Sequence, residues 1–103
     1  MSDSGTFEFF VLNLTKEPLK GTVSWNGAGR TVDIDVNGLE PCAMSRRAAF
    51  SPERGRDDMW SWSERGRQYQ LNCFDGDRYV VVTISDYGIG VLPTATSPDT
   101  WGW

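Results

Sequence analysis

Histidine is absent from this chain of 103 residues. Without an imidazole there is no Ser-His-Asp triad, no Cys-His pair, no histidine metal ligand and no histidine proton shuttle. Any catalysis would have to rest on carboxylate, tyrosine, lysine or arginine side chains. A chain of single-domain size leaves little room for a deep cleft around two carboxylates, so we expect no enzymatic activity and no cofactor.

Cysteine is scarce, with Cys42 and Cys73 as the 2 examples. They lack the Cys-x-x-Cys spacing of a zinc site, and no metal site is expected. A disulfide that joins two strands is one interpretation of the pair. The other, which we favour for a reducing compartment, is that both are small buried side chains.

The chain also lacks a long apolar run and a basic excess. No apolar run approaches the roughly 18 residues of a membrane-spanning helix. The formal net charge of −4 disfavours a general nucleic-acid binder, so no nucleic-acid partner is expected. The first residues include Asp3 and no basic segment, unlike a secretory signal. We therefore expect a cytoplasmic location, or export by a route that needs no signal.

Short runs of apolar or alternating residues, separated by Gly, Asn and Asp turns, make up most of the chain. Strands are predicted at Thr6–Leu14, Leu19–Trp25, Arg30–Val36, Asp57–Ser63, Gln68–Phe74, Arg78–Ser85 and 87–93. Cys42–Phe50 is open between a further strand and a short helical turn. Seven to eight short strands indicate an all-β fold, a small antiparallel β-sandwich.

The sandwich is expected to be a single domain over residues 1–92, followed by a C-terminal tail at 93–103. Pro93 and Pro98 open and interrupt this tail, and proline lacks the N–H donor that a β-ladder needs. The tail ends in Trp101 and Trp103. An indole there can anchor at a membrane interface, fit a partner's pocket or fold back to cap the sandwich. We expect Trp101 to be partly buried, and loss of the last residues to alter binding or self-association more than folding.

The tetrapeptide Glu-Arg-Gly-Arg occurs twice, at Glu53–Arg56 and at Glu64–Arg67. Between the copies, Trp60 and Trp62 share one face of a predicted strand, which favours core packing. A strand of this length spans roughly 23 Å, so the copies should lie near its opposite ends. Neighbouring acids offset the arginine charge. We interpret the copies as charged loop ends and not as a phosphate clamp.

The stretches VLNLTKEPLKGTVSW, LEPCAMSRRAAF and RDDMWSWSERGRQYQLNCF resemble the layout of the small β-sandwich proteins catalogued as the "up-regulated in Daf-two" domain. In that layout an Asn-x-Thr strand end, an Asp-x-Trp strand and a Gly-x-x-Tyr hairpin follow one another. The matching positions here are Asn13, Thr15, Asp58, Trp60, Gly66 and Tyr69.

This resemblance implies a small β-sandwich, and at the level of fold it extends to the aegerolysins, acidic β-sandwiches that recognise membrane lipids. The family usually carries a histidine in its second strand. This chain has Trp25 and Asn26 there, so any role of that histidine is lost.

Two hypotheses about function are consistent with these observations. The first is a non-enzymatic binding module that recognises a membrane lipid headgroup or a glycan through aromatic and polar loop residues. Its candidate ligand-binding residues are Trp62, Arg65, Arg67, Tyr87, Trp101 and Trp103. The alternative is a protein-interaction domain, either an immunity or inhibitor protein with a protein partner or a self-associating subunit that forms a homo-oligomer.

Overall fold

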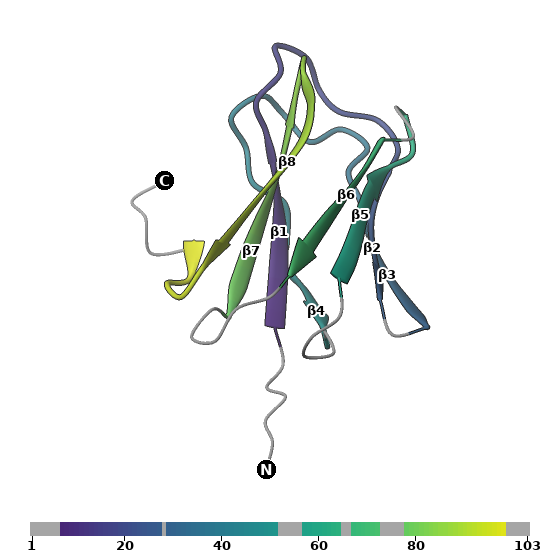
Figure 1. Cartoon of the computed structure of the whole chain (residues 1–103). Helices are drawn as coiled ribbons and strands as arrows, with labels where there is room; N and C mark the ends of the chain where they lie inside the picture. Colours follow the sequence, from purple (N-terminus) through teal and green to yellow (C-terminus); the bar gives the residue numbers. More distant parts are fainter. Residues whose placement is uncertain (1–6, 28, 52–56, 65–66, 73–77, 99–103) are drawn as a thin grey trace.

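The chain forms two four-stranded β-sheets that stack face to face (Figure 1). The computed structural model describes residues 7–27, 29–51, 57–64, 67–72 and 78–98, with the backbone alone for 57–58 and 67–72. Within these ranges, no helix is long and apolar enough to cross a membrane. The predicted all-β sandwich is confirmed.

The first sheet, sheet A, has the strand order β4–β1–β7–β8. Its strands are β1 (Phe7–Asn13), β4 (Ala48–Phe50), β7 (Tyr79–Ser85) and β8 (Gly88–Thr94). Sheet B has the order β3–β2–β5–β6. Its strands are β2 (Thr22–Gly27), β3 (Arg30–Asp35), β5 (Asp57–Trp62) and β6 (Arg67–Asn72).

Strand pairing is antiparallel everywhere in the described sheets except between β1 and β7. These two run parallel, from Glu8 opposite Tyr79 to Asn13 opposite Ile84. The pair joins the first described strand to the seventh, so no local turn or hairpin signal could reveal it. It places β1 in the interior of sheet A, with β4 on one edge and β7 on the other.

The segment Cys42–Phe50, for which the sequence allowed either a strand or a short helical turn, contains no helical turn. Its end forms β4, and the part before β4 runs beside β1, where Met44 bridges to Leu12 and the Ser45 amide donates to the Val11 carbonyl. Cys42 is exposed, has a free thiol and adopts a φ of 64°, so its expected burial was wrong. Cys42 lies in a turn, and its backbone amide donates to the Asn13 carbonyl. Cys73 lies outside the described residues.

The sandwich extends two residues past its predicted end at residue 92. Strand β8 continues to Thr94, with Pro93 opposite Val80, so the boundary predicted at Pro93 lies too early. The reason is that β8 is an edge strand. An edge strand tolerates proline because one side of its backbone has no partner strand to receive an N–H.

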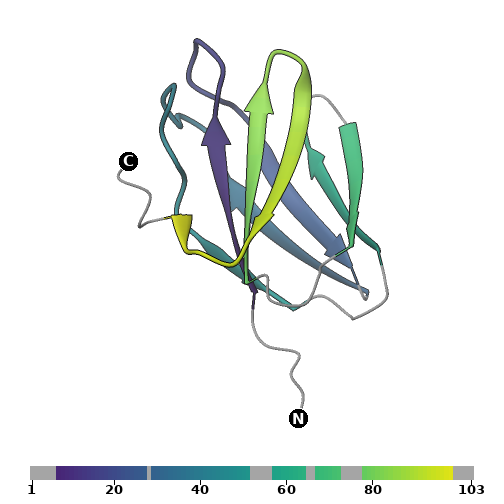
Figure 2. The ribbon, with the colours of Figure 1, turned by 60° about the vertical axis from the view of Figure 1, so that its left-hand side comes forward.

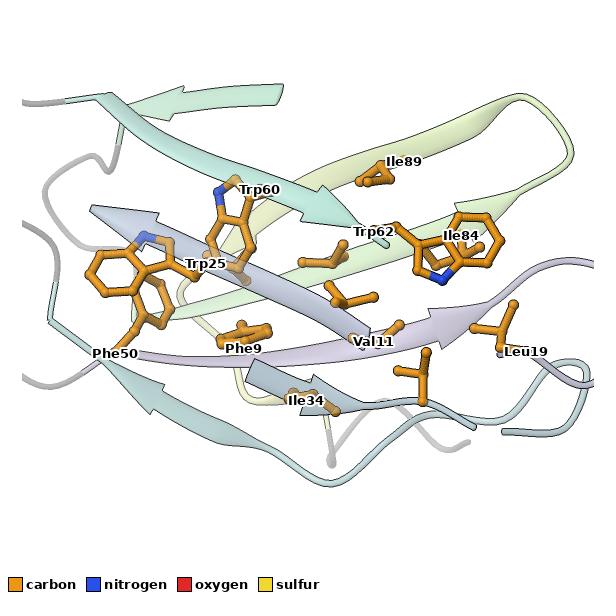
Figure 3. Close-up of a cluster of buried hydrophobic side chains, with 14 of the residues drawn as sticks. Phe9, Val11, Leu19, Trp25, Ile34, Phe50, Trp60, Trp62, Ile84 and Ile89 are labelled. Atoms are coloured by element: carbon orange, nitrogen blue, oxygen red, sulfur yellow. The ribbon is translucent and has the colours of Figure 1, made fainter. Parts of the chain in front are cut away.

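The interior between the sheets is dominated by aromatic rings at one end (Figure 3). Phe50 lies within 5.6 Å of the ring centres of Phe9, Trp25 and Trp60, and Phe9 and Trp60 meet edge to face at 4.9 Å. Trp62 packs toward the other end, near Ile84. The predicted core packing of Trp60 and Trp62 is confirmed, with exposed fractions of 0% and 7%, and Trp25 is buried beside them at 0%.

Strand β5 lies between the two Glu-Arg-Gly-Arg copies, as predicted. The second copy ends at Arg67, whose backbone pairs with Trp62 at the last position of β5. The first copy precedes Asp57, which opens the strand at its other end. Residues 53–56 of the first copy and 65–66 of the second lie outside the described residues.

Replacing Trp60 with alanine should lower the free energy of unfolding by roughly 3–5 kcal/mol, because the cavity would open among Phe9 and Phe50. Urea denaturation measures this loss. The matched control is Met59→Ala, on the opposite, half-buried face of the same strand, and it should cost clearly less. A loss below about 1 kcal/mol for Trp60→Ala would contradict a core role for this ring.

Candidate functional site

A cleft of about 500 Å³ opens at the end of the sandwich where β1, β5 and β7 finish and β2 begins. We call this the cleft end. The cleft is lined by Thr15, Lys16, Glu17, Pro18, Leu19, Lys20, Trp62, Glu64 and Asp86. Its volume lies within the range of small-ligand sites, about 300–1,000 Å³.

The floor of the cleft is apolar and its rim is charged. Leu19 is buried, and Trp62 donates its indole N–H to the Lys20 carbonyl at 2.9 Å, which fixes the ring against the β1–β2 connection. The rim carries two lysines and three carboxylates. Among the described residues, the charged groups of Lys16, Lys20, Glu17 and Glu64 have no ion-pair partner, so both signs of charge are available to a ligand.

Asn13, the last residue of β1, holds the wall of this cleft in place. Its side chain is fully buried, and its amide nitrogen donates to the carbonyls of Glu17 and Leu39, both at 2.8 Å. Its oxygen accepts from the Thr15 amide at 2.8 Å and from the Thr15 hydroxyl at 2.7 Å. Both N–H groups and both acceptor positions of the side-chain amide are therefore used, and these hydrogen bonds offset the cost of burying it away from water.

Gly21 shapes the other side of the cleft, before β2. Its φ of 90° and its close approach to the Ser63 hydroxyl leave no room for a Cβ atom. The same hydroxyl accepts the Thr22 amide at 2.9 Å, and the Gly21 amide donates to the Asn37 side chain at 2.9 Å. The end of β5 is thus fixed against the start of β2, with Glu64 at the rim.

Two exposed apolar side chains lie directly beside the lining residues. Leu14 precedes Thr15 and is 52% exposed, and Tyr87 follows Asp86 and is 91% exposed. Both come from backbone that is held in place: the Leu14 amide donates to the Ile84 carbonyl at 2.7 Å, and the Tyr87 amide donates to the Ser85 hydroxyl at 3.2 Å. The cleft end therefore combines a charged cleft with apolar groups on rigid turns.

The structure brings together only part of the predicted site. Trp62 lines the cleft, Tyr87 stands next to it, and the backbone of Arg67 pairs with Trp62. Arg65, Trp101 and Trp103 lie outside the described residues.

The sequence analysis missed the residues that give the cleft its charge, above all Lys16, Lys20 and Glu64. The Asn13-x-Thr15 strand end was a usable signal, because this pair marks a turn held by side-chain hydrogen bonds. Lys16 and Lys20 belong to the connection that follows it.

No group of three or more acidic or cysteine side chains in the described part of the chain is arranged to hold a metal ion. Comparison with protein-family models, with curated proteins and with solved structures found no match to this chain.

Changing Asn13 to aspartate should lower the free energy of unfolding by about 2–4 kcal/mol, because the carboxylate loses both N–H donors and faces the carbonyls of Glu17 and Leu39. Urea denaturation measures the change. Asn26→Asp makes the same chemical change on the outer face of sheet B, where only an acceptor role toward the Thr31 hydroxyl is used, and it should be nearly neutral. Equal effects of the two substitutions would contradict the role of Asn13.

Proposed function

We propose that this chain is a non-enzymatic binding module that recognises a lipid headgroup at a membrane surface through the cleft end. The observation that carries the proposal is the combination found there: a cleft with both signs of charge, flanked by the exposed side chains of Leu14 and Tyr87. A glycan, the other ligand considered from the sequence, would use the same cleft without needing the exposed apolar groups.

The charge pattern favours a zwitterionic headgroup. Lys16 and Lys20 suit a phosphate, while Glu17 and Glu64 suit an ammonium group, and none of the four is neutralised by a described neighbour. The chain as a whole carries a formal charge of −4, which opposes approach to a strongly anionic surface. A headgroup with one positive and one negative group fits both facts.

The exposed side chains supply a membrane contact that the cleft alone lacks. Tyrosine is enriched at the headgroup level of bilayers, because its ring is amphipathic. Leu14 can enter the acyl boundary beside it, and both residues adjoin lining residues of the cleft. Because their backbone is fixed by hydrogen bonds, little ordering is needed on binding.

A protein-interaction domain is the second candidate function. Tyrosine is also enriched at protein interfaces, and a ring that is 91% exposed on a tight turn can enter a partner's pocket. A partner would then be expected to contact Tyr87 and Leu14 and leave the charged cleft unoccupied.

Vesicle sedimentation tests the membrane proposal. The chain should bind vesicles of phosphatidylcholine and phosphatidylethanolamine more tightly than vesicles rich in phosphatidylserine. Lys16→Ala combined with Lys20→Ala should weaken this binding at least about tenfold, as expected for the loss of charge-assisted hydrogen bonds. Leu14→Ala should also weaken it.

The matched controls lie away from the cleft end. Leu92→Ala removes a leucine of nearly equal exposure, 51%, from strand β8. Arg30→Ala removes an exposed cation from the start of β3, which pairs with the end of β2 that lies away from the cleft. Neither should change binding. Binding to a glycan array without vesicle binding would assign a sugar to the cleft, and vesicle binding that Leu92→Ala weakens as much as Leu14→Ala would contradict the proposed surface.

A further inference from the structure

Two hydrogen-bond donors lie in the interior of the sandwich without an acceptor. Trp25 and Trp60 are both 0% exposed, and no atom of the described residues accepts a hydrogen bond from either indole N–H. Other buried side chains use their donors: the Asn13 amide binds two carbonyls, and the Trp62 indole binds the Lys20 carbonyl. Because most buried polar groups in proteins have a partner, two exceptions on neighbouring strands indicate a missing acceptor.

The strand register places the two indoles next to each other. They belong to β2 and β5, the two inner strands of sheet B, which faces sheet A across the interior (Figure 2). Trp25 stands directly opposite Trp60 in this pair of strands. The Ser63 amide donates to the Thr22 carbonyl, so every second pair from that position is hydrogen-bonded. The two tryptophans form one of the pairs in between, whose Cβ atoms are about 4.5–5.5 Å apart.

The phenyl rings around the indoles do not take up these N–H groups. Phe50 contacts both indoles, with its ring centre 5.0 Å from that of Trp25 and 5.3 Å from that of Trp60. Phe9 meets the Trp60 ring at 4.9 Å. In the view of Figure 3, both indole nitrogens lie on the side of their rings away from Phe9 and Phe50. The faces of the two phenyl rings are therefore not the acceptors, and both donors lie on the same side of this aromatic cluster.

The surroundings of the two indoles define the chemistry of a group that could satisfy them. An indole N–H donates and cannot accept, so this group must be an acceptor. The core cluster that contains both rings is made of hydrophobic residues, so an anion there would lose its hydration without an opposite charge to offset the loss. A neutral oxygen atom avoids this cost, and its two lone pairs can accept from two donors. We infer that Trp25 and Trp60 jointly bind one neutral oxygen acceptor inside the sandwich.

Two sources can supply such an oxygen. One is an internal water molecule, the smallest ligand that can accept from both indoles, and globular proteins commonly hold water at buried polar groups that the protein leaves unpaired. The other is the carbonyl or hydroxyl oxygen of a small neutral organic ligand, whose apolar part would pack against the aromatic rings. Neither Trp25 nor Trp60 lines the cleft, so the inference holds whatever the cleft binds.

Nuclear magnetic resonance of the full, isotope-labelled chain tests this site and distinguishes the two sources. Trp25→Phe and Trp60→Phe assign the two indole N–H signals, since each removes one signal and keeps an aromatic ring. With water as the ligand, both N–H protons should show Overhauser contacts to a long-lived water molecule. With an organic ligand, titration with acetone, a small neutral carbonyl compound, should shift both signals until they saturate. Trp62 is the matched control, because its N–H already binds the Lys20 carbonyl, and it should show neither response.

The variants also test whether one oxygen is shared. With a shared oxygen, Trp60→Phe removes one of its two donors and weakens its binding to the other. The water contact or the acetone shift at the Trp25 proton should therefore be reduced several-fold in this variant.

A water contact at both indoles, or an acetone shift that saturates at both, supports the inference and names the source. A wild-type spectrum in which no indole N–H shows either response would overturn it, and this result needs no variant to fold. An equal response at Trp62 would also overturn it, because the signal would then not depend on an unpartnered donor. An unchanged response of Trp25 in a folded Trp60→Phe variant would lead to the same conclusion, because the two indoles would then not share one oxygen.

Discussion

The buried amide of Asn13 connects the fold to the site. It stands at the end of β1, a strand in the interior of sheet A, and binds both the turn that follows and the carbonyl of Leu39 in a distant connection. A buried amide is stable only when its donors and acceptors are used, so the two segments are forced into one arrangement. That arrangement places Thr15 and Glu17 in the wall of the cleft.

Strand β1 also organises both faces of sheet A. On the inner face, Phe9 and Val11 meet the tryptophans of sheet B across a tightly packed interior. On the outer face, Phe10 and Leu12 need a cover that the sandwich core does not provide. A strand that is apolar on both sides thus requires partners on both of its faces.

Local patterns in the sequence predicted most of the fold, because alternation and turn residues act over a few positions. Trp60 and Trp62 were placed in the core for this reason. The parallel pairing of β1 with β7 was not predictable, since it joins distant segments without a turn. The cleft was not predictable either, because its charged residues are distant in sequence. Lys16 and Glu64 belong to separate connections, and only the folded chain brings them to one rim. Trp62, which the sequence analysis assigned to core packing and also named as a candidate ligand-binding residue, is buried and lines the cleft.

The central claim is that ligand recognition occurs at the cleft end. Backbone amide shifts of the labelled chain, recorded while nanodiscs of phosphatidylcholine and phosphatidylethanolamine are added, test it most directly. The account predicts that perturbations concentrate at Leu14–Lys20, at Trp62–Glu64 and at Asp86–Tyr87, the segments that line or flank the cleft. Perturbations centred on the β2–β3 turn at the opposite end, with the cleft segments unchanged, would contradict it.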